Sequence, residues 1–194
     1  MSGISGTERQ RLARLLVKTK SFQYSPNAPF QLASGATSPY YFDLRLLNGD
    51  PEGINTVASM LYGVIKNTGA RSVGGLESGS ISIATAISQL SWIEHQKSTG
   101  PLIESFFVRK EQKRHGTGKR IEGMIRSPAV IVDDVITSGM SAMSAVNVLR
   151  KEGFECKCIV SIIFRGTKEQ RNSIENEIPL QFIFSQDQLV EQFK

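Results

Sequence analysis

Two uninterrupted apolar runs constrain the fold of this chain more than any other feature. They are "AVIVDD" at 129–134 and "CIVSIIF" at 158–164, and neither alternates between apolar and polar residues. A strand of this kind is covered on both faces, which is typical of a parallel sheet. The segment 141–152 between them is amphipathic and Gly153 follows it, so we predict a helix that ends there. Strand, helix and strand in this order predict a crossover between parallel neighbours.

The rest of the chain repeats this alternation. We predict further helices over 7–19, 51–69 and 81–90, and further strands over 72–76, 102–110 and 180–184. The predicted fold class is therefore α/β, with a mostly parallel central sheet flanked by helices. Residues up to about 50 break the pattern, with two short strands expected over 28–45, and we predict that they form a small hood over the end of the sheet. The length suits a single domain, 1–194, with a core from about 51 to 194.

Composition excludes several classes of protein. An apolar content of 40% and a charged content of 21% are typical of a globular protein and not of a disordered one. No apolar run approaches the ~20 residues that span a bilayer, and the N-terminal segment lacks the apolar centre of a secretory signal. The cysteines, Cys156 and Cys158, lack the spacing of a redox or zinc site. We therefore expect a cytoplasmic protein that does not bind a membrane.

The net charge of +5 is concentrated in one short segment. Residues 109–120, "RKEQKRHGTGKR", contain six Lys or Arg side chains and one acid, Glu111. The net charge of this segment therefore equals the net charge of the whole chain. A surface that binds duplex nucleic acid would spread its charge over a face, so we expect no nucleic-acid partner. A solvated charged face would be the usual interpretation of such a run. Its glycines and its place after a predicted strand favour a loop that closes on an anion.

Four predicted strands end in polar, charged or glycine-containing segments. These segments are "ESGS" at 77–80, the basic segment at 109–118, "DDVITSG" at 133–139 and "RGT" at 165–167. Ligands of such sheets bind beyond the carboxyl ends of the strands. We therefore expect the four segments to form one site.

The stretch "VIVDDVITSGMSA" at 130–142 places two acids directly before a phosphate-binding type of loop. Thr137, Ser138 and Ser141 supply hydroxyls at the start of a predicted helix, where free N–H groups and the helix dipole favour an anion. The loop is not a Walker A motif, because the Gly-Lys-Thr/Ser is missing. Asp133 and Asp134 suit the hydroxyls of a sugar and would stabilise positive charge developing on it. A lone Asp-Asp pair would be interpreted as solvated acids before a capped helix, but the whole pattern favours a phosphorylated sugar as ligand.

Four stretches resemble the orotate phosphoribosyltransferase family of the type I phosphoribosyltransferases. "VIVDDVITSGMSA" resembles the superfamily's signature for phosphoribosyl pyrophosphate (PRPP). "RKEQKRHGTGKRIEG" resembles the family's catalytic loop, "FQLASGATSPYYFDLR" its N-terminal segment and "GLESGSISIATAIS" its pyrophosphate-binding loop. Together they cover roughly residues 30–166. The resemblance implies the type I phosphoribosyltransferase fold. It also implies conversion of orotate and PRPP to orotidine 5'-phosphate and pyrophosphate, in UMP biosynthesis.

The resemblance further implies how PRPP is held. Asp133 and Asp134 would bind the ribose hydroxyls. The loop after them would bind the 5-phosphate through Val135, Ile136, Thr137, Ser138, Gly139, Met140 and Ser141. The pyrophosphate-binding loop would contain Glu77, Ser78 and Gly79. A homodimer is implied, in which Arg109, Lys113 and His115 reach into the partner's site, while Lys110 contacts pyrophosphate from its own subunit. The implied catalytic residues are Arg109, Lys113, His115, Asp133 and Asp134.

Orotate carries a carboxylate, and the resemblance implies that Arg165 binds it, since a guanidinium suits a planar carboxylate. Tyr41 and Phe42 would lie along the base, and Thr137 would contact it. Mg²⁺ is the implied cofactor, held by PRPP and water without a protein ligand. The chain departs from the family at positions where members often carry lysine or, in the loop, an acid: Ala33, Ser78 and Arg114.

Two other functions are compatible with the same motifs. One is a phosphoribosyltransferase for another base, although a neutral purine would not need Arg165. The other is a non-catalytic PRPP-binding regulator. We find no helix-turn-helix upstream of the motifs, and a regulator would have little reason to keep the catalytic-type loop complete.

Overall fold

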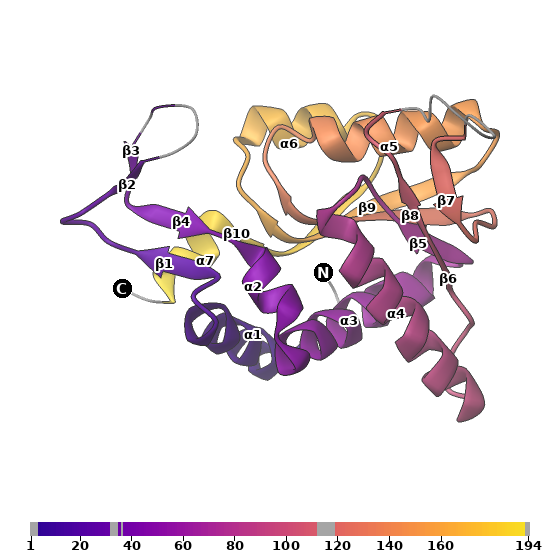
Figure 1. Ribbon diagram of the computed structural model, residues 1–194, viewed down its shortest axis with the longest axis horizontal. Coiled ribbons are helices and arrows are strands. Elements are labelled where there is room, and N and C mark those ends of the chain that lie inside the picture. The colour runs from indigo at the N-terminus through magenta and orange to yellow at the C-terminus, as the bar shows by residue number, and fades with distance from the viewer. Residues whose placement is uncertain (1–3, 32–34, 36, 112–118, 193–194) are drawn as a thin grey trace.

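A computed structural model describes residues 4–31, 35, 37–111 and 119–192 of the chain. Within these residues, the centre of the fold is a six-stranded sheet (Figure 1). In spatial order its strands are β10 (Leu180–Ser185), β9 (Cys156–Phe164), β8 (Ala129–Ile136), β5 (Ser72–Gly74), β6 (Glu104–Val108) and β7 (Ile121–Gly123). Neighbours are parallel except β6 and β7, which pair antiparallel. The predicted α/β class with a mostly parallel sheet is confirmed.

Helices cover both faces of this sheet. On one face lie α3 (Pro51–Ile65) and α4 (Gly79–Gln96), and on the other lie α5 (Met140–Lys151) and α6 (Lys168–Glu175) (Figure 1). The carboxyl ends of the parallel strands therefore open between two helical layers. A ligand at that edge can contact residues of both layers.

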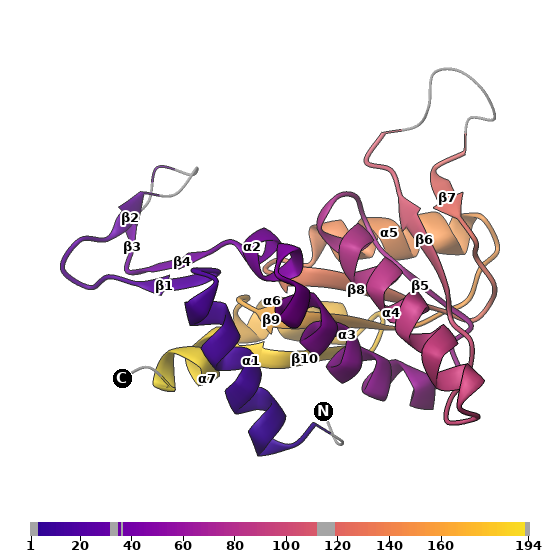
Figure 2. The ribbon, with the colours of Figure 1, turned by 60° about the horizontal axis from the view of Figure 1, so that its bottom comes forward.

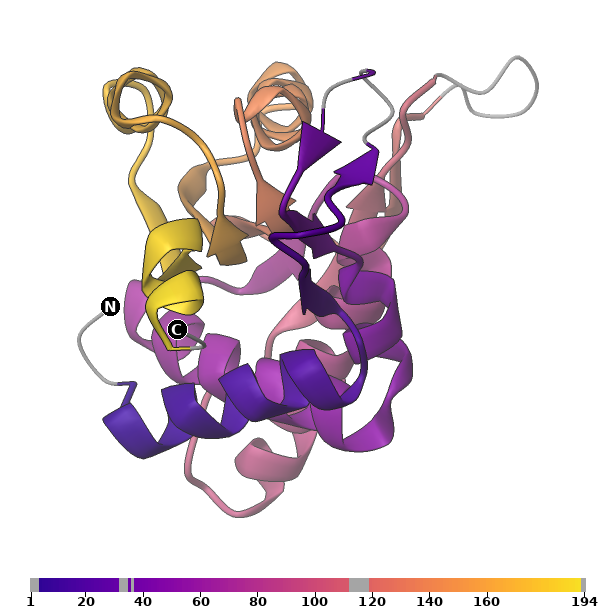
Figure 3. The same cartoon turned by 90° about the vertical axis from the view of Figure 1, so that its left-hand side faces the viewer.

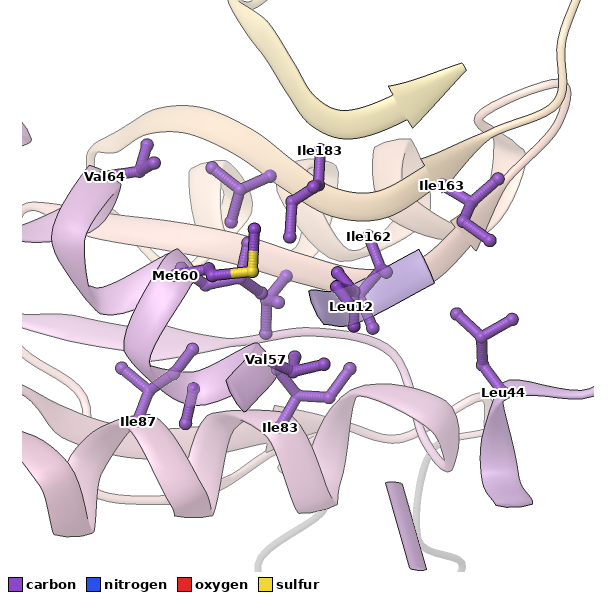
Figure 4. Packing of buried hydrophobic residues seen from close by; sticks show 14 of the residues in the cluster. Leu12, Leu44, Val57, Met60, Val64, Ile83, Ile87, Ile162, Ile163 and Ile183 are labelled. Carbon is purple, nitrogen blue, oxygen red and sulfur yellow. The ribbon is translucent and has the colours of Figure 1, made fainter. Parts of the chain in front are cut away.

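The apolar residues of β8 explain why helices pack on both faces of the sheet. Val130 and Val132 pack in a cluster with side chains of α3 and α4, whereas Ala129 and Ile131 pack in a cluster with side chains of α5. All four are fully buried. Figure 4 shows the first cluster, in which the labelled side chains of α3 lie between those of α4 and those of β9 and β10.

The boundaries of α3 follow from its sequence. The Asp50 side chain accepts a hydrogen bond of 2.8 Å from the N–H of Gly53, and Pro51 occupies the first helical position. A 3-10 turn, η1 (Lys66–Thr68), follows α3, and Gly69 ends it with a left-handed φ of 74°. The next helix, α4, extends beyond the predicted range of 81–90 at both ends.

The N-terminal residues form two helices with four short strands between them. In order the elements are α1 (Gly6–Lys18), β1 (Phe22–Tyr24), β2 (Phe30–Gln31), β3 (Thr37–Ser38), β4 (Tyr40–Phe42) and α2 (Leu44–Gly49). β1 pairs antiparallel with β4, and β2 with β3, so this part of the chain projects as a ribbon (Figure 2). The prediction of two strands over 28–45 was wrong in number, because the three strands there, β2, β3 and β4, are only two or three residues long and have no detectable alternation. The division into a hood and a core stays a prediction.

The C-terminal residues pack against the first helix. β10 leads into a short helix, α7 (Gln186–Glu191), which lies beside α1 (Figure 3). Arg9 of α1 donates a hydrogen bond of 2.6 Å to the carbonyl oxygen of Ile183 in β10. Its guanidinium also lies 5.9 Å from the ring centroid of Phe184. The two ends of the described chain therefore hold each other in place beside the sheet.

In the described ranges, the helices are too short or too polar to cross a bilayer.

Candidate active site

The four predicted strand-end segments meet around one pocket of about 360 Å³. This volume is in the range of small-molecule sites. The residues that line it come from the end of β4, the start of α2, the loop between β5 and α4, the ends of β6, β8 and β9, and the first turn of α5. They are Phe42, Asp43, Leu44, Arg45, Leu76, Glu77, Ser78, Gly79, Lys110, Asp133, Asp134, Val135, Ser141 and Arg165.

Asp133 and Asp134 face different layers at the end of β8. Neighbouring residues of a strand point to opposite faces, and these two lie where the strand reaches the pocket. Asp134 lies at the α4 layer, since a Cβ at Gly79 would be 3.1 Å from each of its carboxylate oxygens. Asp133 lies at the α5 layer, where it also lines the hollow formed by the phosphate-type loop. Adjacent acids therefore place one carboxylate on each side of the sheet edge.

The environment of Asp133 changes its ionisation. Burial, followed by the negative charge of Asp134, raises the pKa of Asp133 to about 7. Each carboxylate also accepts a hydrogen bond from the next backbone N–H. These bonds are 2.9 Å from Asp134 to Asp133 and 2.7 Å from Val135 to Asp134. The side chains are thus oriented before any ligand binds, and a ligand with positive charge would favour the ionised form of Asp133.

The loop after β8 forms a hollow of about 130 Å³ at the first turn of α5. Gly139 takes a left-handed φ of 81°, and a Cβ there would lie 2.5 Å from Cδ1 of Ile174 in α6, so a larger residue does not fit. Among the described residues, no side chain caps α5, which leaves its first N–H groups to a ligand. Ile136 also lines the hollow, although its side chain is buried in the core.

The predicted pyrophosphate-binding loop lies opposite this hollow, at the start of α4. Ser78 and Gly79 line the pocket at the first turn of the helix. The carboxylate of Glu77 accepts a hydrogen bond of 2.7 Å from the backbone N–H of Lys110. The backbone N–H of Glu77 donates to the carbonyl oxygen of Val108 at 2.8 Å. The loop is thus fixed to the end of β6, and Lys110 is held at the mouth of the pocket.

The basic segment connects β6 and β7, and only its two ends, 109–111 and 119–120, lie within the described residues. Lys113 and His115, both predicted catalytic residues, lie outside the described residues. The stem is described, and there the guanidinium of Arg120 donates hydrogen bonds of 2.8 and 3.1 Å to the carbonyl oxygens of Arg109 and Lys110. Arg109 itself does not line the pocket, and its guanidinium lies 4.0 Å from Glu122. The structure therefore brings Lys110, but not Arg109, to this pocket.

At the far end of the pocket, the predicted orotate residues separate into two groups. Arg165 and Phe42 both line the pocket, and the guanidinium carbon lies 4.5 Å from the ring centroid. Burial lowers the pKa of Arg165. Tyr41, which alternates with Phe42 along β4, instead packs on Phe30 at 5.5 Å between ring centroids and does not line the pocket. Thr137 lines the phosphate-type hollow rather than this end.

Two charged pocket residues were not predicted from the sequence. Asp43 and Arg45, at the start of α2, form a paired contact of 2.7 and 2.8 Å at the pocket mouth. The hydrogen bonds from Arg45 lower the pKa of Asp43. The "FDLR" in the N-terminal motif contains both residues, but nothing in its pattern indicates that they pair with each other.

Comparison with known proteins gives a consistent family. No family model matches the chain. An orotate phosphoribosyltransferase of Bradyrhizobium sp. (strain ORS 278) is 40% identical over 161 residues, which cover 79% of this chain and 83% of that protein. An orotate phosphoribosyltransferase of Aquifex aeolicus (strain VF5) is 34% identical over 185 residues, which cover 94% and 98%. The crystal structure of Mycobacterium tuberculosis H37Rv orotate phosphoribosyltransferase in complex with PRPP has a TM-score of 0.73 and 25% identity, covering 94% and 99%.

Proposed function

This chain belongs to the orotate phosphoribosyltransferase family, and we propose that it joins orotate to the phosphoribosyl group of PRPP with release of pyrophosphate. The product is orotidine 5'-phosphate, on the route to UMP. One observation supports this reaction most directly. One pocket is lined both by the Asp133–Asp134 pair, which lies beside the phosphate-type loop, and by Arg165, which does not line that loop's hollow. This set of groups suits a phosphorylated sugar joined to a base with a carboxylate.

The acidic pair suits the charge changes of this reaction. As pyrophosphate leaves, positive charge develops on the ribose ring, and ionised carboxylates beside it stabilise the transition state. Asp133 has its pKa raised to about 7 by burial and by Asp134, so in the free protein near neutral pH it is partly protonated. Positive charge in the site favours its ionised form. Asp133 would therefore carry more negative charge in the transition state than in the free protein, and the pair would stabilise the transition state accordingly.

The phosphate and the leaving group would be held by different layers. N–H groups of the first turn of α5 and the hydroxyl of Ser141 would bind the 5-phosphate. Ser78, Gly79 and Lys110 line the pocket on the α4 side, where the pyrophosphate would lie. We expect Lys113 and His115 to close over it from the basic segment, which would also exclude water.

We propose that Mg²⁺ enters with PRPP. Nowhere in the described part of the chain do three or more His, Cys, Asp or Glu side chains form a group that could hold a metal ion. Mg²⁺ commonly keeps several waters and takes other ligands from one or two carboxylates and from phosphates. Asp133 and Asp134 fit that pattern through the water shell. When bound, the ion would neutralise charge on the departing pyrophosphate.

We propose a homodimer in which the basic segment of one subunit closes the site of the other. Two observations support it. Arg109 is directed to Glu122 rather than into the pocket of its own subunit. Trp92 and Leu102 are 56% and 46% exposed and line one hollow together with Arg71, Glu104 and Arg126, and dimer interfaces commonly bury large exposed apolar side chains beside charged ones.

Mixing two inactive variants tests this arrangement. Lys113→Ala removes a loop residue and Asp134→Asn removes a pocket residue, so a mixed dimer would contain one intact site. Reassembly of equal amounts should restore roughly a quarter of wild-type activity, by random pairing of subunits. Activity that stays at the level of the separate variants would refute the shared loop.

A cytoplasmic location is proposed on the state of the thiols. Cys156 and Cys158 are free. Burial raises the pKa of Cys156 to about 11 and that of Cys158 to about 12, so neither is a ready nucleophile. Unpaired, unreactive thiols are usual in a reducing compartment.

The reaction is tested by the near-ultraviolet absorbance of orotate. We expect it to fall when the protein is mixed with orotate, PRPP and Mg²⁺, and to stay constant when any one of them is left out. Chelation of Mg²⁺ should stop the fall, and added Mg²⁺ should restore it. If absorbance stays constant while calorimetry shows that PRPP binds, the orotate assignment is wrong. Adenine, guanine and hypoxanthine would then be tested as the accepting base.

A further inference from the structure

The guanidinium of Arg165 is held on two sides by segments far apart in the sequence. The ring of Phe42, from β4, covers one face at 4.5 Å from its centroid to the guanidinium carbon. Gln186, the first residue of α7, lies at the edge. There Nε of Arg165 donates a hydrogen bond of 3.2 Å to Oε1 of Gln186. Both side chains of this pair are partly buried, so water competes weakly for the bond.

This contact selects which nitrogens face the ligand. A guanidinium can present either its Nε–Nη edge or its two terminal nitrogens to a carboxylate. Gln186 occupies Nε, which leaves the two terminal nitrogens as the free fork. Among the described residues, none accepts a hydrogen bond from those nitrogens, although Arg165 lines the pocket. A planar carboxylate that enters the pocket meets a fork whose orientation is already set.

The neutrality of Gln186 matters as much as its oxygen. Within the described residues, Arg165 has no Asp or Glu in salt-bridge distance, in contrast to Arg45, which is paired with Asp43. A carboxylate at position 186 would cancel the charge that a ligand carboxylate needs. An amide oxygen orients the guanidinium and leaves its charge available. A half-buried cation without a counter-ion is costly, and an anionic base removes that cost.

The backbone places Gln186 reproducibly beside Arg165. Ser185 pairs with Phe164 in the parallel ladder of β10 and β9. Gln186 follows Ser185 and Arg165 follows Phe164, so the two residues leave the ladder side by side. Ser185 also caps α7 in a reciprocal pair of hydrogen bonds with Gln188. The turn from strand to helix is therefore fixed just where Gln186 leaves it.

We propose that Gln186 is a positioning residue for Arg165, so that the C-terminal strand and helix determine selectivity for a base that carries a carboxylate. This inference rests on the proposed function, because it assumes that Arg165 meets the carboxylate of orotate. It assigns a role to a segment outside the motifs by which the family resemblance is identified. The role lies in orientation, since Gln186 itself does not line the pocket.

The test compares two nucleotides that differ only in the carboxylate. Orotidine 5'-phosphate and uridine 5'-phosphate share the sugar, the phosphate and the pyrimidine ring, and both are measured as inhibitors of the wild-type protein and of Gln186→Leu. We expect Gln186→Leu to raise the inhibition constant of orotidine 5'-phosphate about tenfold, which is the scale of one charge-assisted hydrogen bond. The inhibition constant of uridine 5'-phosphate should stay unchanged. The KM for orotate should rise by a similar factor, with little change in kcat or in the KM for PRPP.

Gln192→Leu is the matched control. It makes the same change at the exposed C-terminal end of α7, and it leaves both the Ser185–Gln188 cap and the contact with Arg165 in place. We expect the ratio of the two inhibition constants to stay at the wild-type value. A wild-type ratio in Gln186→Leu, or equal weakening of both nucleotides, would overturn the inference. Wild-type protein that does not consume orotate would instead overturn the proposed function, and the inference with it.

Discussion

The two ends of the pocket are assembled in different ways. At the sugar-phosphate end, both carboxylates, the loop and the start of α5 come from residues 133–141 of one continuous stretch. At the base end, Phe42 comes from the N-terminal ribbon, Arg165 from the end of β9 and Gln186 from the C-terminal helix. The first end is set by local backbone geometry. The second depends on three segments being packed together.

This difference teaches where specificity can change. The sugar-phosphate end tolerates few substitutions. A side chain at position 139 would require Ile174 to move, and the two acids are neighbours on one strand. At the base end, each contact to the guanidinium comes from a separate segment, so one contact can change while the others remain. A change of base would therefore require fewer coordinated substitutions than a change of sugar phosphate.

The largest effect is expected at the sugar-phosphate end. Asp134→Asn keeps the shape of the side chain beside Gly79 but removes its negative charge. We expect kcat/KM for PRPP to fall by about 100- to 1000-fold, the scale seen when one electrostatic partner of a transition state is lost. Steady-state kinetics provide the measurement, and an unchanged thermal midpoint shows that the fold is intact. A loss below tenfold would mean that the acidic pair is not the centre of that end.

At the base end, Arg165→Leu should change the KM for orotate and leave the KM for PRPP nearly the same. Loss of the guanidinium removes a charge-assisted pair to the orotate carboxylate. We therefore expect the KM for orotate to rise roughly 10- to 100-fold with the KM for PRPP nearly unchanged. Initial rates over a grid of both substrates give the two constants. If both rise together, the two ends are not independent and the comparison fails.

The rigidity of the phosphate-type loop is tested by two glycines with the same backbone. Gly139 and Gly153 both have φ of 81°, but a Cβ at Gly139 meets Ile174 whereas one at Gly153 meets no atom within 4 Å. We expect Gly153→Ala to lower the free energy of unfolding by about 1 kcal/mol, from the backbone alone. Gly139→Ala should cost about 3 kcal/mol, because overpacking is added. Urea denaturation measures both, and equal losses would show that Ile174 moves aside freely.

The smallest effect is a dependence of stability on pH. The pKa of Asp133 is raised to about 7 when folded, and an unfolded Asp has a pKa of ~3.9. Between these values the folded state holds a proton that the unfolded state releases, so this group's contribution is full below pH ~4 and is lost as pH rises to about 7. We expect Asp133→Asn to match wild type near pH 4 and to be more stable by about 1–2 kcal/mol at pH 8.

Asp43→Asn should act in the opposite direction. The hydrogen bonds from Arg45 lower the pKa of Asp43, so that carboxylate stabilises the fold above its unfolded pKa and stops doing so as pH falls through the lowered value. Urea denaturation from about pH 2 to pH 8 gives both curves, with the change for Asp43 expected below pH ~4 and that for Asp133 above it. Parallel curves for wild type and Asp133→Asn would refute the raised pKa of Asp133.

Sequence reasoning found the parts of the site that are continuous along the chain. The strand at 129–134, the helix after it and the four strand-end segments all follow from local patterns, because burial on both faces and helix capping leave a periodic signal. The antiparallel pairing of β6 and β7 was missed, because β7 is three residues long and has no such pattern. The helix at 81–90 was predicted too short, since its C-terminal part is mostly exposed.

The parts that were missed depend on local turns, on strand direction and on contacts between separate segments, none of which leaves a periodic pattern in the sequence. Arg45 pairs with Asp43 only because the start of α2 turns at the pocket mouth. Gln186 meets Arg165 through the register of β9 and β10, and no motif marks it. Tyr41 and Phe42 look equivalent in the sequence, but strand alternation directs only Phe42 toward the pocket. Roles implied by resemblance alone, including those of Lys113 and His115, stay predictions.

The stem of the β6–β7 hairpin has a consequence for variation in chain length. Arg109 and Arg120 pair through their backbones at 2.8 Å, and the Arg120 side chain closes the same ring by bonding two carbonyl oxygens. Residues inserted or deleted between these anchors would change the circumference of the closed loop without shifting Lys110 relative to Glu77. The added cost of a longer loop grows only with the logarithm of its length. The length of this segment can therefore differ between related chains without a change in the shape of the pocket.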